Sequence, residues 1–175
     1  MTTDNKDQIN HDTSTDSQAT SETQYPFFIT DQYVKDISFE NPNFLVKYQE
    51  NREQPQVSVN VETNASKLQD THYEVAMKVE VKSFTSDKKN VFVLELVYAG
   101  LITINPESAS DVLEPILLVH CPFLMFPFIR DIVANITSSG GYSPLLMEPI
   151  DFASLYIRKK QLENSKEENA TATKN

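Results

Sequence analysis

The chain is poor in residues that many catalytic and cofactor sites require. Its 175 residues include a single cysteine, Cys121, so no disulfide can form within the chain. No further Cys/His cluster is present to complete a zinc site. With only three glycines, the chain has no glycine-rich loop that could cradle a phosphate. We therefore expect neither a metal nor a cofactor.

Positive charge is also scarce. Fifteen Lys and Arg residues face 25 Asp and Glu residues, for a formal charge of −10, and the basic residues cluster only at 158–160. Phosphate binding needs concentrated positive charge, so nucleic acid is not an expected partner, and a basic protein surface suits the chain better.

Signals for export and membrane insertion are weak. The N-terminus lacks a basic segment followed by an apolar run. Residues 112–136 are apolar, but Glu114, Arg130, Asp131 and three prolines interrupt them. These features predict a cytoplasmic protein with no direct membrane insertion.

Two polar ends flank the apolar part of the chain. Residues 1–24 and 161–175 are rich in Asp, Glu, Asn, Ser and Thr. Such segments cannot bury enough apolar surface to offset the entropy lost on ordering, so both are predicted to be disordered tails. The folded domain is expected to span residues 25–160.

Four segments have the pattern of β-strands, namely 25–39, 56–61, 72–82 and 91–104. Apolar and polar residues alternate in the second and third, as in half-buried antiparallel strands. The fourth is apolar on both faces, and Glu95 alone interrupts the second face. That acid fits either a docking patch or a solvated edge, with about even odds on the residues alone.

The C-terminal half predicts helices. A capping box at Asp111–Glu114 opens a helix that Pro122 is expected to break or kink. Residues 120–136 then form a helix that is apolar nearly all round, which predicts burial on several sides, most simply by a second copy of the chain. Asp151 is predicted to cap a short final helix.

The order of these elements predicts an α+β fold, a four-stranded antiparallel sheet with two C-terminal helices packed on one face.

The His120–Cys121 pair could support a thiol nucleophile, as in a thioesterase-like or small-ligand-binding protein. A helix-interior cysteine packed in the core is the favoured interpretation, at about nine to one.

The region from Tyr25 to Lys160 resembles the SecB family of export chaperones. The resemblance is carried by the string KDISFENP at 35–42, YEV at 73–75, FVLE at 92–95, HCP at 120–122, FP at 126–127 with Arg130, and PIDF at 149–152 with Leu155 and Tyr156. These motifs, in this order, are much more specific than any one of them alone.

The resemblance implies an ATP-independent chaperone, not an enzyme, that assembles as a homotetramer, a dimer of dimers. It would hold unfolded precursor proteins in the cytoplasm and deliver them to SecA, the motor of the Sec pathway. A related possibility is a SecB-like chaperone dedicated to one partner, as in toxin–antitoxin systems.

The resemblance also assigns roles to residues. It implies a SecA-docking surface at Asp36, Glu40, Val93 and Glu95. It makes Phe44, Tyr48, Phe92, Phe152 and Tyr156 candidates for an apolar client groove. The oligomer interface is expected on the apolar helix, at Met125, Phe128, Ile129 and Ile132.

Overall fold

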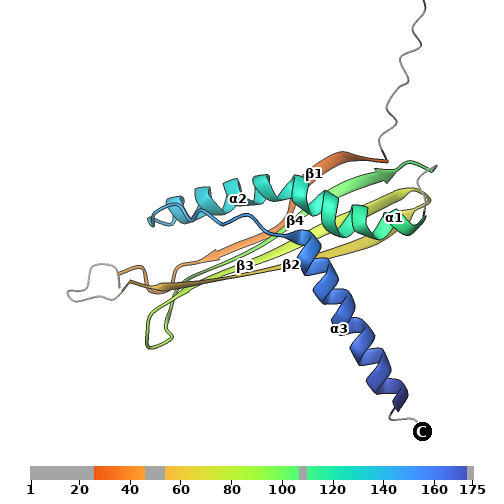
Figure 1. Ribbon diagram of the computed structural model, residues 1–175. Coiled ribbons are helices and arrows are strands. Elements are labelled where there is room, and N and C mark those ends of the chain that lie inside the picture. Colours follow the sequence, from red (N-terminus) through yellow and green to blue (C-terminus); the bar gives the residue numbers. More distant parts are fainter. Residues whose placement is uncertain (1–25, 46–53, 107–109, 173–175) are drawn as a thin grey trace, which may run out of the picture.

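The computed structural model describes residues 26–45, 54–106 and 110–172. The predicted N-terminal tail and Tyr48 lie outside these residues. Four strands come first, followed by a long helix in three segments and a last helix (Figure 1). Their bounds are β1 Phe27–Glu40, β2 Gln56–Gln69, β3 His72–Phe84, β4 Asn90–Ile104, α1 Ser110–Pro115, η2 Ile116–His120, α2 Cys121–Ser139 and α3 Phe152–Ala172.

The strands form one antiparallel sheet in the order β1-β4-β3-β2. The predicted α+β class and the four strands are confirmed, although β2 continues eight residues beyond the predicted segment 56–61, to Gln69. The first two strands are therefore the two edges of the sheet. β1 carries two register shifts against β4, one of them between Val34 and Asp36.

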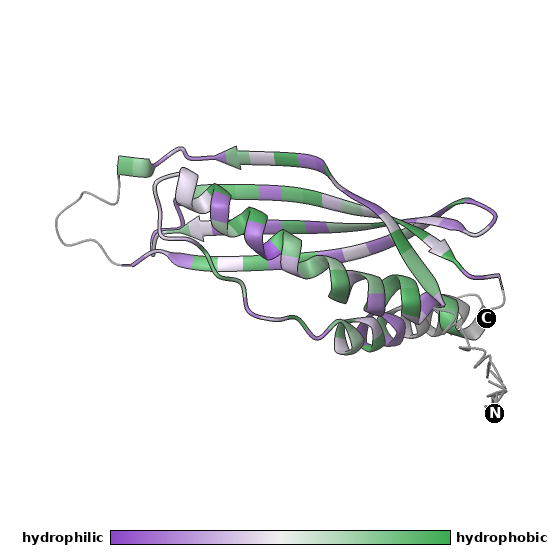
Figure 2. Cartoon of the chain, turned by 90° about the horizontal axis from the view of Figure 1, so that it is seen from above, coloured by the Kyte–Doolittle hydropathy of each residue, from purple (hydrophilic) through white to green (hydrophobic). Residues whose placement is uncertain are grey.

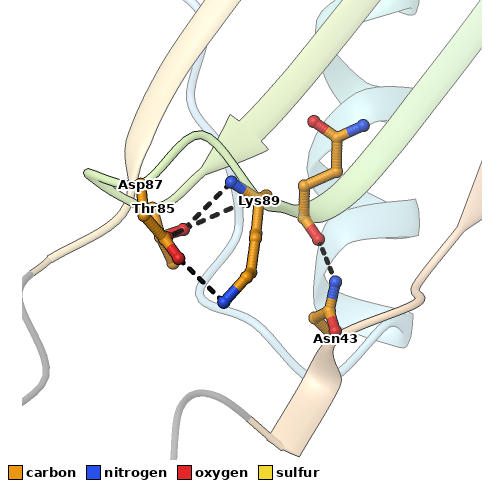
Figure 3. A network of polar contacts seen from close by, with 5 residues as sticks. Asn43, Thr85, Asp87 and Lys89 are labelled. Carbon is orange, nitrogen blue, oxygen red and sulfur yellow. Dashed lines mark hydrogen bonds and ion pairs between the residues drawn. The ribbon is translucent and has the colours of Figure 1, made fainter.

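The turn between β3 and β4 is held by its own side chains (Figure 3). The Thr85 hydroxyl bonds to the Asp87 carboxylate, and the Lys89 ammonium lies 2.8 Å from the same carboxylate. The Lys89 amide donates to the Thr85 hydroxyl at 3.2 Å. Beside the turn, the Asn43 side chain donates to the carbonyl of Asn90 at 2.7 Å, which attaches the connection after β1 to the start of β4.

The long helix is not broken at Pro122, where the sequence predicted a break or a kink. Helical structure is continuous from Ser110 to Ser139, with a π-helical segment, η2, just before the proline. The amide of Cys121 donates to the carbonyl of Ile116, five residues back. This wider turn lets the helix accept a proline, which lacks an amide hydrogen and clashes with the carbonyl four residues earlier in a regular helix.

The core lies between this helix and one face of the sheet. The side chains of Val75, Met77, Leu94 and Leu96 are fully buried there, as are Met125, Ile129 and Val133 of α2. A side chain at Gly100 would come within 3.0 Å of the Met125 sulfur, so glycine lets the helix approach the sheet closely. We call the helix-covered side of the sheet the inner face and the opposite side the outer face.

The last helix differs from the prediction in two ways. It was expected to pack on the sheet beside the long helix, but α3 contacts η2 and then projects beyond the sheet (Figure 1). It also continues to Ala172, so most of the predicted C-terminal tail is helical. Eight of residues 161–172 are Glu, Ala, Gln, Leu or Lys, which have high helix propensity, so a polar segment can extend a helix that has already been nucleated.

Candidate binding surfaces

The register of β1 and β4 gathers the four predicted docking residues on the outer face. Asp36 lies opposite Val97, Ser38 opposite Glu95, and Glu40 opposite Val93. Residues opposite each other in a sheet point to the same side, and alternate residues of a strand are about 7 Å apart. Asp36, Glu40, Val93 and Glu95 therefore share one patch, which we call the acidic patch.

Strand β3 extends this patch. Glu80 lies directly opposite Glu95, and Lys82 lies opposite Val93. The Lys82 ammonium is paired with Glu80 at 2.5 Å. The alternation of β3 could have indicated that Glu80 points away from the core, but only the register shows that it neighbours Glu95.

A second polar group lies on the outer face, beyond the acidic patch. Glu74 of β3 accepts hydrogen bonds from the Lys35 ammonium at 2.5 and 3.0 Å and from the Tyr33 hydroxyl at 2.9 Å. Bonding to Lys35 lowers the pKa of Glu74, and bonding to Glu74 raises the pKa of Lys35. The pKa of Tyr33 is raised because its hydroxyl donates to the same carboxylate.

An aromatic cluster forms at the end of the inner face where α2 finishes. The ring of Tyr142 lies 4.9 Å from that of Phe92 and 5.8 Å from that of Phe44, and Phe92 also contacts Phe39 at 5.7 Å. The Tyr142 hydroxyl donates to the Asn41 side chain at 2.5 Å. Phe44 and Phe92 were predicted. Phe39 was missed because its contact with Phe92 depends on the pairing of β1 with β4, and Tyr142 because its contacts depend on the path of the chain after α2.

The other two described groove candidates lie elsewhere. Phe152 is buried and packs edge-on against Phe126 at 5.6 Å. The Tyr156 hydroxyl donates to Glu114 at 3.1 Å, and Lys160 pairs with the same carboxylate at 2.8 Å. These contacts attach α3 to the start of the long helix. The structure therefore does not bring the four described groove candidates into one cluster.

An apolar hollow of about 550 Å³ lies along β2. Its walls are mainly aliphatic, from the edge strand, from the segment between α2 and α3, and from the first turns of α3: Val57, Val59, Val61, Leu145, Leu146, Met147, Ile150 and Leu155. Val57, Val59 and Leu146 are 46%, 43% and 76% exposed, so the hollow is open to solvent. The alternation of β2 shows that these valines share a face, but not that this part of the face is left uncovered.

Only part of the predicted oligomer interface is exposed. Met125 and Ile129 are fully buried in the chain's own core, and Ile132 is half-buried, whereas Phe128 is 50% exposed. The sequence assigned these residues to one face, but it could not set the rotation of the helix against the sheet. Phe123 and Leu124, at 66% and 48%, are exposed with Phe128.

The hydropathy of the long helix changes along its length. Its N-terminal half is largely hydrophobic and its C-terminal end more hydrophilic (Figure 2). By length and composition, Val112–Ser139 could also cross a membrane, but the buried core helix of many proteins passes the same test. In this chain, one side of the helix packs against the sheet.

The geometry around His120 and Cys121 argues against thiol chemistry. Cys121 is fully buried, and this burial raises the pKa of its thiol to about 12. A thiol with so high a pKa carries almost no thiolate at neutral pH, and the thiolate is the nucleophile and the metal ligand. Among the residues that the structure describes, no group of three or more His, Cys, Asp or Glu side chains could hold a metal ion.

Comparison with known proteins supports an assignment to chaperones. A family model described as preprotein translocase subunit SecB matches residues 20–163. A protein-export protein SecB from Afipia carboxidovorans is 41% identical over 73% of this chain and 78% of its own length. Another, from Rhodospirillum rubrum, is 38% identical over 85% of this chain and 92% of its own.

A solved structure shares the fold. A SecB-like chaperone of Mycobacterium tuberculosis, determined in complex with a peptide from an antitoxin, superimposes with a TM-score of 0.58 over 71% of this chain and 91% of its own. Its sequence is 14% identical, so it supports the arrangement of strands and helices and nothing finer.

These matches define the class of protein as a non-enzymatic chaperone of the Sec export pathway. The chain belongs to the SecB family. Membership implies binding of preproteins and of SecA.

Proposed function

We propose that this chain acts in the cytoplasm as an ATP-independent holdase, which keeps precursor proteins unfolded and passes them to SecA. The observation that carries this proposal is the pairing of an open apolar hollow along β2 with an acidic patch on the outer face of the same sheet. The first suits extended apolar segments of a client, and the second suits a basic partner.

The client site that the structure favours is wider than the five aromatic candidates. The aliphatic walls beside β2 are exposed, whereas Phe92 and Phe152 are buried, so a client would first meet Val57, Val59 and Leu146. A flexible aliphatic and aromatic lining can accept many side chains, which suits binding with little sequence preference. Phe44, Phe92 and Tyr156 would contribute where a client displaces their present contacts.

The proposed assembly is a homotetramer, a dimer of dimers, of the domain at residues 25–160. Phe123, Leu124 and Phe128 form an exposed apolar strip on the long helix. Large contiguous apolar patches on a protein surface mark sites of interaction. We assign the strip, in place of Met125 and Ile129, to the contact between copies of the chain.

Light scattering on a sizing column tests both parts of this proposal. The chain would be mixed with a permanently unfolded protein and, as the matched control, with the folded form of that protein. We expect a mass near four chains and retention of the unfolded form only. A monomer that retains neither form would overturn the proposal.

A chaperone dedicated to one antitoxin is the second candidate. One specific observation favours it, namely the shared fold with the Mycobacterium tuberculosis chaperone that was solved with an antitoxin peptide. We favour general export, because relatives about 40% identical over most of the chain are export proteins. Strong preference for one peptide over unrelated unfolded proteins would reverse that order.

A further inference from the structure

Lys35 places a positive charge next to the acidic patch. It lies between Val34 and Asp36, where the register of β1 against β4 shifts, and it directly precedes Asp36 in the chain. A free lysine in this position could reach toward the Asp36 carboxylate and offset its charge. The acidic patch would then attract a basic partner less strongly.

The structure holds this lysine away from the patch. Its ammonium contacts both carboxylate oxygens of Glu74, at 2.5 and 3.0 Å. Glu74 lies opposite Leu101, whereas Asp36 lies opposite Val97, so Glu74 is four residues further along β4. At the rise of a strand this is roughly 14 Å, on the side away from Glu40 and Glu95.

Glu74 is well suited to this role. Its side chain is only 14% exposed, whereas that of Lys35 is 48% exposed, so the lysine is drawn toward a partly shielded carboxylate. The Tyr33 hydroxyl donates to Glu74 at 2.9 Å and fixes the carboxylate from β1. The lowered pKa of Glu74 and the raised pKa of Lys35 keep both groups charged at neutral pH.

We propose that Glu74 is a positioning residue for partner docking, which withdraws the Lys35 ammonium from Asp36 and so preserves the negative potential of the acidic patch. The inference rests on the proposed SecA-docking role of that patch. Without Glu74, the Lys35 ammonium turns toward Asp36 and competes with the basic groups of SecA for its carboxylate.

The test compares variants of matched charge in a titration of SecA at low salt. Glu74→Gln removes one negative charge and the ion pair that holds Lys35. Asp31→Asn is the control, because Asp31 also lies opposite Leu101 and has no ion pair among the described residues. We expect Glu74→Gln to weaken SecA binding about threefold more than Asp31→Asn, with the difference shrinking at high salt.

A rescue variant separates positioning from structure. Lys35→Gln combined with Glu74→Gln has the wild-type net charge and no lysine to release, so SecA affinity should return to the wild-type value. If the double variant stays as weak as Glu74→Gln alone, or if Glu74→Gln matches Asp31→Asn, the positioning role is wrong.

Asp36→Asn tests the acidic patch itself in the same titration. If Asp36→Asn binds SecA as the wild type does, the proposed docking surface fails and this inference fails with it. If Asp36→Asn weakens binding but Glu74→Gln does so no more than Asp31→Asn, only the role of Glu74 fails.

Discussion

The two faces of the sheet are built by the same strands and differ in what covers them. On the inner face, Leu94 and Leu96 of β4 are fully buried beneath the long helix. On the outer face, their neighbours Val93 and Glu95 are partly exposed and lie among charged side chains of β1 and β3. The difference shows how one strand can hold the fold together with alternate residues and leave the others free to bind.

Truncation of adjacent residues of β4 that point to opposite faces should give the largest difference between the two faces. Leu96→Ala should lower the free energy of unfolding by about 2–5 kcal/mol, because it opens a cavity in the core. Val97→Ala, on the outer face, should cost less than about 1 kcal/mol. Urea denaturation at fixed protein concentration measures both, and equal losses would contradict the assignment of faces.

The exposed apolar strip of the long helix allows a second test. Phe128→Asp should reduce the mass in solution below four chains, because assembly would bury an unpaired carboxylate. The fold of each chain should survive, since Phe128 is half exposed in the isolated chain. Ser138→Asp, which adds the same charge at an exposed position near the hydrophilic end of the helix, serves as the control. A Phe128→Asp variant that keeps wild-type mass would remove the strip from the interface.

The attachment of α3 should have the smallest effect. Lys160 holds the pKa of Glu114 below its ordinary value of 4.5, so the ion pair stabilises the structure above that pH and is lost as the pH falls through the lowered pKa. Because both side chains are partly exposed, Glu114→Gln should cost less than about 1 kcal/mol at pH 7. Thermal unfolding of the two proteins should differ at pH 7 and converge below pH 4.5. A difference that grows on acidification would contradict this account.

Periodicity predicted the strands well but does not indicate which strands lie side by side. The alternation of 72–82 identified which residues of β3 are buried, because a strand half covered by a helix shows its faces in its sequence. The shift between Val34 and Asp36 could not be anticipated, and it determines where Lys35 lies. Register depends on contacts between strands that no single segment encodes.

The prediction of which side of the long helix is buried was wrong for a different reason. Apolar residues around 120–136 indicated burial on several sides. In the structure, Met125 and Ile129 are buried in the core between the helix and the sheet, whereas Phe128 is exposed. A helix that is apolar nearly all round does not reveal its rotation. The docking residues were predicted from family resemblance, and the structure adds that Asp36, Glu40, Val93 and Glu95 lie within three successive rows of one face.

The claim that SecA and clients bind to different faces of the sheet is tested most directly by two titrations of Glu95→Lys, one with SecA and one with a permanently unfolded client. Reversing the charge at the centre of the acidic patch should weaken SecA binding by about tenfold or more, because like charges then oppose each other. Client binding should be unchanged, since the hollow beside β2 does not include Glu95. Equal loss of SecA binding and client binding would contradict the assignment of the two partners to separate surfaces.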